Sequence, residues 1–406
     1  MERYLLINQI DVNLCEVILH KPGKSLKTFE LPRQFLNALN LYKPVGGVLR
    51  DLTRKYSNGC PCPDKPACPP CPPPSPPRDI KITICGANGQ LGQIIAFLLK
   101  QSPLVNVLNL YDLDCTYGTA MDLAHIDTSC RVKSYSGCAD LYEAMCDANI
   151  IIICAGVGRA PGMCLNDLFE YNAPVVKQLT EAIITVNPRA LIGVLTNPIN
   201  SFVPMVSQIF KNCKCYDSRK IFGITTIDTM RACTIVANDI LRGTEDPGEF
   251  LVPVIGGHSP ETMVPVLSQT SPCVDIPNTS YDFLIDKIRR AACMVTSLKH
   301  HGGPRLSVAL GAARFINNLI RGLKNERDII EMAYVYTNVV PGVCYFAGPI
   351  ELGPHGIKHN LGLLKVDEDW EQPYLKEAIR QLKIEICRGE TYIPCPPDPC
   401  AVPSWD

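Results

Sequence analysis

Short apolar runs rich in β-branched residues recur along the middle of the chain, at residues 80–86, 105–112, 149–156 and 190–198. Between them lie stretches with the apolar spacing of an amphipathic helix, such as 91–101 and 173–186. Strands that are apolar throughout and alternate with helices indicate a parallel sheet covered by helices on both faces. The pattern therefore predicts an α/β fold with a doubly wound parallel sheet, the Rossmann architecture that binds nucleotides.

The pattern changes after about residue 225, where long helical stretches and hairpin-like segments follow, the latter at 251–259 and 262–269. We interpret this region as a second domain of the α+β class. Its last helix is expected over 372–389, with apolar residues spaced i, i+3, i+4 and with Gly389 as its stop signal. The two predicted domains are therefore a nucleotide-binding domain at 80–224 and a second domain at 225–393.

Two segments rich in proline and cysteine flank these domains, at residues 56–79 and 394–406. Proline fixes φ and lacks a backbone N–H, so we expect the first segment, a linker, to be an extended spacer rather than a helix or a central strand. Residues 1–55 form a separate N-terminal extension. The extensions at the two ends of the chain are candidates for binding a partner protein.

The linker contains four closely spaced cysteines, Cys60, Cys62, Cys68 and Cys71. Thiolates at such short spacing could bind zinc. Their spacing is not a pair of C-x-x-C knuckles, however, and the prolines hinder the tight turns that a knuckle needs. Exposed thiols that crosslink or bind nothing are the favoured alternative, and no metal site is predicted.

The charge balance argues against two classes of partner. The chain has 39 Lys and Arg against 40 Asp and Glu, whereas proteins that bind nucleic acid or a membrane surface carry a basic excess. The longest apolar runs are too short to cross a bilayer, and no secretory signal is visible. Most of the 21 cysteines are scattered singly through apolar segments, which predicts buried free thiols and a reducing compartment; examples are Cys85, Cys154, Cys233 and Cys344.

A glycine-rich turn, "GANGQLG", follows the first apolar run and places Gly86, Gly89 and Gly92 before the first helix. Glycines there let backbone N–H groups approach a pyrophosphate at the helix N-terminus. The second run ends at Asp112, whose carboxylate could accept hydrogen bonds from a ribose diol and would repel a 2′-phosphate. The G-x-x-G-x-x-G spacing alone is a weak signal, but strand, turn, helix and acid in register predict a site for NAD.

Candidate catalytic residues lie where later strands and loops end. Asn197 precedes a proline at a strand end, and Asp228 and Arg231 are spaced to share one face of a helix. His258 follows two glycines. An Asp bonded to a His fixes the tautomer and stabilises the imidazolium, which gives a proton donor and acceptor near neutral pH. Taken alone, each of these residues more often has a structural role. Only their occurrence together, in this order along the chain, favours an active site.

A further loop is expected at 158–169, "GRAPGMCLNDLF", whose single cation is Arg159. With this loop the chain resembles the lactate/malate dehydrogenase superfamily from Ile80 to about Ile393, most closely the NAD-dependent malate dehydrogenases of mitochondrial and bacterial type. The matching motifs, in family order, are "GANGQLG", "LYD", "AGVGRAPGM", "YNAPVVK", "LTNPINS", "GITTIDTMRA" and "VPVIGGHS". The resemblance implies a two-domain oxidoreductase, usually a homodimer, that interconverts malate and oxaloacetate.

The resemblance also assigns roles by position. His258 would be the acid–base residue, Asp228 would orient it, and Arg231 would bind the first carboxylate of a dicarboxylate substrate. Arg159, on a loop that closes over the substrate, would bind the second carboxylate. Asn197 would lie near the substrate carbonyl and the nicotinamide.

Asn172 and Asn197 would complete the cofactor site formed by the three glycines and Asp112. A mitochondrial location is implied by the same resemblance, with a cytoplasmic location as the alternative.

Three departures from the family concern catalysis. Leu165 stands where the family has a second arginine that polarises the reacting carbonyl. Loss of one preorganised donor of this kind typically costs about 10²–10³ in rate. The stretch that faces the nicotinamide reads "GGPRLS", with Pro304 and Arg305 in a shortened loop, and Pro260 and Glu261 follow His258. Arg305 is a candidate replacement for the missing cation.

These departures leave two main hypotheses. The first is an NAD-dependent malate dehydrogenase slowed by Leu165. The second is a structural or scaffolding paralogue that keeps the fold and attaches to an assembly through its Pro/Cys-rich arms. A dehydrogenase for a different 2-hydroxy acid is less favoured, because Arg159 still specifies a second carboxylate.

Overall fold

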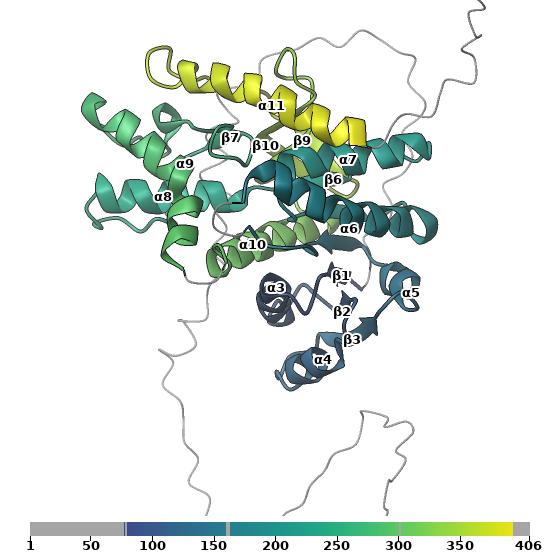
Figure 1. The fold of residues 1–406 in the computed structure, drawn as a ribbon. Helices are drawn as coiled ribbons and strands as arrows, with labels where there is room; N and C mark the ends of the chain where they lie inside the picture. The colour runs from purple at the N-terminus through teal and green to yellow at the C-terminus, as the bar shows by residue number, and fades with distance from the viewer. Residues whose placement is uncertain (1–76, 78, 160–162, 300–301, 393–406) are drawn as a thin grey trace, which may run out of the picture. The chain divides into compact units, whose positions relative to one another are not determined.

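The strands of the described residues form a mixed sheet. The computed structural model describes residues 77, 79–159, 163–299 and 302–392. The sheet has 11 strands in the order β3-β2-β1-β4-β5-β6-β9-β10-β7-β8, with β11 beside β10. In Figure 1, β1, β2 and β3 lie at one end of this sheet, and β9, β10 and β7 lie toward the other. The strands are β1 Lys81–Cys85, β2 Val107–Asp112, β3 Arg131–Ser136, β4 Ile150–Ile153, β5 Leu191–Val194, β6 Ile221–Ile224, β7 Val254–Gly256, β8 Met263–Pro265, β9 Ile329–Tyr336, β10 Tyr345–Gly353 and β11 Gly356–Asn360.

The first six strands pair in parallel, in the order typical of a dinucleotide-binding sheet. The predicted runs at 80–86, 105–112, 149–156 and 190–198 are confirmed as β1, β2, β4 and β5. The pattern of apolar runs does not find β3, because this edge strand is polar and its side chains are exposed or half-buried. The predicted Rossmann fold is therefore present.

Helices cover both faces of this parallel part. The helices are α3 Gln90–Lys100, α4 Tyr117–Ala124, α5 Leu141–Met145, α6 Leu165–Val186, α7 Ile199–Asn212, α8 Thr226–Asp239, α9 Tyr281–Leu298, α10 Leu306–Leu323 and α11 Gln372–Tyr392, with short 3-10 helices at Leu267–Gln269 and Asn278–Ser280. On one face, α3, α4 and α10 share a core with Ile82, Ile84 and Ile152. On the other face, α5, α6, α7 and α11 pack with Ile151 and Ile153. Alternate residues of one strand thus supply two separate cores.

The sheet continues across the boundary predicted at 224/225, because β6 pairs with β9 in antiparallel orientation. Strands β9, β10 and β11 then form an antiparallel meander. The hairpin-like segments predicted at 251–259 and 262–269 are confirmed as the β7–β8 pair. Helices α8 and α9 pack with this hairpin in a third core that contains Val236, Val254 and Ile285.

The last helix does not end at Gly389, contrary to the stop expected there. Helix α11 runs through this residue to Tyr392. A Cβ at Gly389 would lie 2.0 Å from the backbone oxygen of Ser201 on α7. The glycine is therefore needed because two helices approach closely, not because the helix changes direction.

The loop predicted at 158–169 is shorter than expected, because α6 begins at Leu165. Cys164 caps the helix: its sulfur accepts from the Asp167 N–H at 3.4 Å, and its own N–H donates to the Asp167 carboxylate at 3.1 Å. Hydrogen bonds to the Asp167 carboxyl from the Cys164 side chain and from the Cys164 backbone N–H lower the pKa of Asp167. The motif is a capping box with a thiol in place of the usual hydroxyl, which is why sequence inspection for Ser or Thr does not find it.

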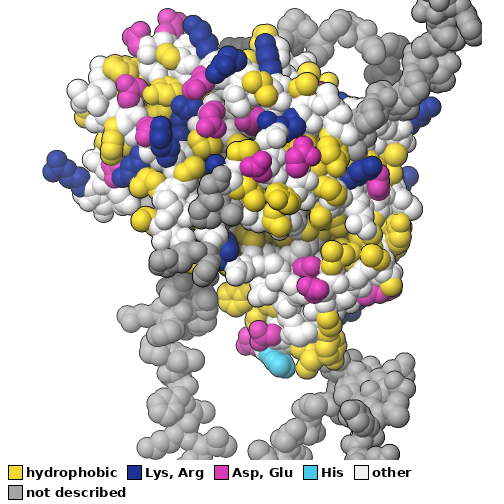
Figure 2. All heavy atoms as spheres, viewed as in Figure 1, with side chains coloured by type: hydrophobic (Ala, Val, Ile, Leu, Met, Phe, Trp, Pro, Cys, Tyr) yellow, Lys and Arg dark blue, Asp and Glu magenta, His cyan; other side chains and the backbone are white. Residues whose placement is uncertain are grey.

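The cysteines are more exposed than predicted. Cys85 and Cys233 are buried free thiols as expected, but Cys344 is exposed, and so are several others among the described free cysteines. The cysteines Cys60 to Cys71 and the predicted segments at 1–55 and 394–406 lie outside the described residues. So does the predicted linker at 56–79, apart from residues 77 and 79. None of the helices that the structure describes has the length and apolarity needed to span a membrane. Figure 2 shows Lys and Arg intermixed with Asp and Glu on the face over α9 and α11.

Candidate active site

A histidine–aspartate pair links the turn after β7 to the start of helix α8. His258 follows β7, and Asp228 lies in the first turn of α8. The His258 Nδ1 atom lies 2.6 Å from Asp228 Oδ2. The Asp228 side chain is 1% exposed and that of His258 is 13% exposed. A bond at Nδ1 leaves Nε2 as the ring nitrogen that can exchange a proton with a bound molecule.

The same carboxylate also holds Arg231, one helical turn later. Arg231 Nη1 lies 3.3 Å from Asp228 Oδ1, so the predicted contact on one helix face is present. Burial lowers the pKa of the Arg231 guanidinium, and the nearby Asp228 carboxylate opposes this effect. An arginine that is only 12% exposed and has one carboxylate contact keeps further N–H donors for a second anion.

Arg159 is brought to the same place by the loop after β4. Its Nε donates to the Met163 carbonyl at 2.9 Å, and its Nη1 lies 3.9 Å from Cys293 Sγ on α9. Cys293 is also close enough to Arg231 to influence its pKa. Cys293 therefore contacts the Arg159 guanidinium and lies within electrostatic range of the Arg231 guanidinium. The sequence did not predict Cys293, because it belongs to no local motif in α9.

His258 is also held through its backbone. Its N–H donates to Asn200 Oδ1 at 2.9 Å, and Asn200 is 2% exposed at the start of α7. Asn200 lies inside the "LTNPINS" motif, three residues after the predicted Asn197. Asn197 itself is exposed after β5. The motif therefore contributes two residues: the buried Asn200, which holds the His258 backbone, and the exposed Asn197.

The residues that depart from the family lie in different environments. Leu165 is half-buried as the first residue of α6. Arg305 occupies the N-cap position of α10 without a capping bond from its side chain. Its guanidinium lies over Gly302, where a Cβ would be 2.2 Å from Nη2. The Pro260 carbonyl accepts a hydrogen bond from Arg289, which ties the segment after His258 to α9.

The three predicted glycines form a tight cradle before α3. Gly86 has φ +97°, and a Cβ on it would lie 2.6 Å from Ala155 after the neighbouring strand β4. A Cβ on Gly92 would lie 2.1 Å from the Gly86 carbonyl oxygen. Gly89 is the N-cap of α3. The first N–H groups of a helix have no intrahelical acceptor, so the cradle offers donors to an anion.

Asp112 is tied to this cradle. Its Oδ2 accepts from the Asn88 N–H at 2.8 Å, and its Oδ1 accepts from the Leu113 N–H at 2.8 Å. Asn88, inside the glycine motif, donates its side-chain amide to the Asp114 and Cys115 carbonyls. Each carboxylate oxygen keeps a further lone pair for a ribose hydroxyl.

Asn172 connects two loops at the same edge of the sheet. Its Oδ1 accepts from the Val157 N–H at 2.7 Å, and its Nδ2 donates to the carbonyls of Val157 and Asn197. Its side chain is buried, at 1% exposure. Any effect of Asn172 on a cofactor would act through the positions of these loops.

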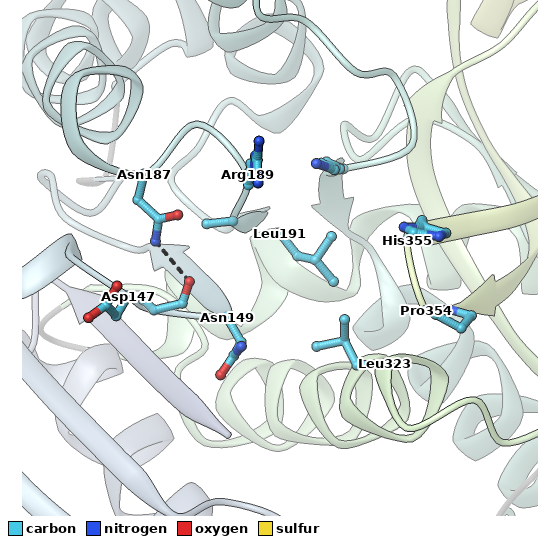
Figure 3. A pocket seen from close by; sticks show the side chains of 11 residues that line it. Asp147, Asn149, Asn187, Arg189, Leu191, Leu323, Pro354 and His355 are labelled. Carbon is cyan, nitrogen blue, oxygen red and sulfur yellow. Dashed lines mark hydrogen bonds between the residues drawn. The ribbon is translucent and has the colours of Figure 1, made fainter. Parts of the chain in front are cut away.

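A cavity of about 450 Å³ lies at the opposite edge of the sheet, near the amino ends of β4, β5 and β6 (Figure 3). Arg189, Lys220 and His355 line it. It also lies near the C-terminal ends of α6 and α10, where cations offset the negative end of the helix dipole. We therefore interpret these charges as structural and place the candidate active site at the carboxyl edge.

The chain is similar to dehydrogenases over the whole described region. Residues 80–223 match the family model of the lactate/malate dehydrogenase NAD binding domain, and residues 225–392 match that of the lactate/malate dehydrogenase alpha/beta C-terminal domain. The mitochondrial malate dehydrogenase of Caenorhabditis elegans is 40% identical over 314 residues, which are 77% of this chain and 91% of that protein. The enzyme of Rattus norvegicus is 38% identical over 354 residues, covering 87% and 98%.

Solved structures show the same fold. The malate dehydrogenase of Cryptosporidium parvum superposes with a TM-score of 0.66 at 22% identity, covering 77% of this chain and 99% of that one. The lactate dehydrogenase of Eimeria maxima, solved with NADH and oxamate, gives a TM-score of 0.65 at 23% identity, covering 75% and 92%. With both domain models matched in order, the chain belongs to the lactate/malate dehydrogenase family.

Proposed function

We propose that this protein is an NAD-dependent oxidoreductase that interconverts malate and oxaloacetate. The observation that carries the proposal is the cluster of His258, Asp228, Arg231 and Arg159 at the carboxyl edge of the parallel sheet. The cluster combines a proton donor with two guanidinium groups, which suits a small molecule with a ketone and two carboxylates. The division into an NAD-binding part, 80–224, and a substrate part, 225–393, belongs to this proposal.

The residues of the cradle fit NAD. Gly86 and Gly92 leave no space for a Cβ, so the backbone can approach a pyrophosphate beside the first turn of α3. Asp112 is the last residue of β2, the strand next to β1, and its carboxylate would accept hydrogen bonds from the ribose diol. Asn197 would lie near the nicotinamide. NADH, when bound, supplies the hydride for the carbonyl carbon.

The chain itself supplies orientation and a proton. Arg231 would bind the carboxylate next to the ketone, and Arg159 would bind the distal carboxylate. His258 Nε2 would donate its proton to the carbonyl oxygen, while the Asp228 carboxylate, 2.6 Å from Nδ1, stabilises the imidazolium before the transfer. Leu165 supplies no polarising charge, so turnover is expected to be slow.

The direct test is turnover by the purified full-length protein. With NADH and oxaloacetate, the nicotinamide absorbance should fall, and it should fall much more slowly with pyruvate, which lacks the second carboxylate. Binding of NADH without turnover in the wild type and in Leu165→Arg would support the scaffolding alternative instead.

Replacing Arg159 is expected to reduce the preference for a dicarboxylate. In Arg159→Gln, kcat/KM for oxaloacetate should fall about 10- to 100-fold, because a charge-assisted hydrogen bond worth about 1.5–3 kcal/mol is lost. The value for pyruvate should change little. Arg189→Gln, at the opposite edge of the sheet, is the matched control. Equal losses for both substrates would place Arg159 outside the distal-carboxylate site.

Replacing a cradle glycine is expected to weaken NADH binding. In Gly92→Ala, the Cβ would meet the Gly86 carbonyl at 2.1 Å and force the turn apart. Overpacking of this kind typically costs about 1–3 kcal/mol, and the dissociation constant for NADH, measured by fluorescence titration, should rise. Gly118→Ala, whose Cβ would meet no atom within 4 Å, should leave it unchanged.

The remaining assignments also belong to the proposal. A homodimer is expected from the family, and a mitochondrial location is supported by relatives that are named as mitochondrial enzymes. We propose that the Pro/Cys-rich arms bind a partner protein. Deletion of residues 1–78 should leave NADH binding intact if the arms are separate from the catalytic part.

A further inference from the structure

A buried carboxylate on the last helix contacts the segment that carries His258. Glu385 is 1% exposed on α11. Its Oε2 accepts from Asn200 Nδ2 at 2.6 Å, and its Oε1 accepts from Ser259 Oγ at 3.1 Å and from Gln381 Nε2 at 3.2 Å. Two of these donor residues lie next to His258. Asn200 accepts from the His258 backbone N–H, and Ser259 is the next residue in the chain.

The Asn200 amide has only one orientation that satisfies both of its neighbours. The His258 backbone N–H can only donate, so it requires Oδ1, which it meets at 2.9 Å. The other end of the amide then presents Nδ2 to Glu385 and, at 2.9 Å, to Thr262 Oγ1. An ionised carboxylate is an acceptor only, so Glu385 and the His258 N–H favour the same orientation.

The position of the helix makes these contacts close. A Cβ on Gly257 would lie 2.6 Å from Asn200 Nδ2, and one on Gly389 would lie 2.0 Å from the Ser201 carbonyl oxygen. Ser201 Oγ donates to the Glu385 carbonyl at 2.7 Å. The glycines therefore allow α7, α11 and the turn before His258 to meet around one carboxylate.

Arg388 and Tyr334 are ionisable neighbours of Glu385 in the described part of the chain. Burial raises the pKa of this carboxyl, and the bonds from Asn200, Gln381 and Ser259 lower it, as does the charge of Arg388 on the same helix. On the sheet side the ionisable neighbour is Tyr334, whose pKa burial raises and the Glu385 charge raises further. Because three donors face its two oxygens, the ionised form is the one that this network satisfies.

We propose that Glu385 is a positioning residue for His258, holding residues 258 and 259 through the Asn200 amide and the Ser259 hydroxyl so that the imidazole meets Asp228. The importance of this role rests on the proposed function, in which His258 transfers the proton. A displacement of about 1 Å in a catalytic group, caused by a change away from the reacting atoms, can lower the rate about 100-fold.

The test measures the His258 ring directly. NMR of the full-length protein with isotope-labelled histidine would follow the titration of the His258 imidazole, assigned by its loss in His258→Gln. In Glu385→Gln the charged acceptor of the Asn200 Nδ2 group becomes a neutral amide oxygen, so the Asn200 amide is held less firmly and its bond to the His258 N–H loosens. The midpoint of this titration should then move to lower pH than in the wild type, because the imidazolium is held less firmly against the Asp228 carboxylate.

Glu390→Gln makes the same substitution on the same helix and should leave the titration unchanged. Ser259→Ala removes one of the three contacts to the Glu385 carboxylate, together with the contact between the Ser259 and Thr262 hydroxyls. It tests the idea if Glu385→Gln does not fold, and it should give a smaller fall. In turnover, Glu385→Gln should lower kcat with little change in KM for oxaloacetate.

An unaltered His258 titration in both Glu385→Gln and Ser259→Ala, with only a lower unfolding temperature, would overturn the inference and leave Glu385 a packing residue. A shifted titration in a protein whose wild type shows no turnover would support the positioning role and contradict the proposed function.

Discussion

Replacing His258 by glutamine is expected to lower kcat for oxaloacetate by about 10²–10⁴, the usual contribution of a general acid. Glutamine can form a hydrogen bond, but it has no proton to release near neutral pH. The Asp228 carboxylate, 1% exposed, would also lose the imidazole that lies 2.6 Å away. NADH affinity should be preserved, because the glycine cradle lies on different elements.

The measurement is steady-state oxidation of NADH together with a fluorescence titration of NADH binding. His125→Gln is the matched control, since His125 is an exposed histidine after α4 and should behave as wild type. Full activity of His258→Gln would show that another group donates the proton.

Introducing an arginine at position 165 is expected to raise kcat by about 10²–10³, because a preorganised cation would stabilise the negative charge that develops on the carbonyl oxygen. Leu165 is half-buried at the start of α6. A cation in the first turn of a helix is unfavourable by about 0.3–1 kcal/mol, so the Leu165→Arg protein should unfold at a slightly lower temperature while turning over faster.

Leu165→Met keeps an apolar side chain of similar volume and should match the wild type in both properties. A Leu165→Arg protein that folds, binds NADH and shows no gain in kcat would mean that position 165 does not face the ketone. The presence of leucine at position 165, where the family has an arginine, would then favour the scaffolding hypothesis.

The parallel part of the fold is readable from the sequence because its strands are buried on both faces. An all-isoleucine strand such as β4, Ile150–Ile153, leaves few alternatives. Two features were not predicted correctly. Strand β3 was missed because it lies at the edge of the sheet and is polar. Gly389 has the usual sequence signature of a helix end, although it serves a helix–helix contact. Both depend on neighbours that are remote in sequence.

In the candidate site, too, residues with a local sequence pattern can be predicted, and residues that depend on remote neighbours cannot. Asp228, Arg231 and His258 could be proposed from short motifs, and the structure places them in contact. Glu385 and Cys293 have no local motif, because each acquires its neighbours only when α11 and α9 pack against the turn after β7 and the loop after β4. The residues proposed to react or to bind substrate can therefore be predicted from the sequence, whereas the residues that support them can be identified only from the folded structure.

The most direct measurement is a crystal structure of the wild type with NADH and hydroxymalonate, an unreactive dicarboxylate with a hydroxyl in place of the ketone. We expect the His258 Nε2 atom within hydrogen-bonding distance of that hydroxyl, with Arg231 and Arg159 on the two carboxylates and the nicotinamide alongside. A dicarboxylate bound away from His258, or a cradle that does not hold the pyrophosphate, would contradict the assignment of this cluster as the site of oxaloacetate reduction.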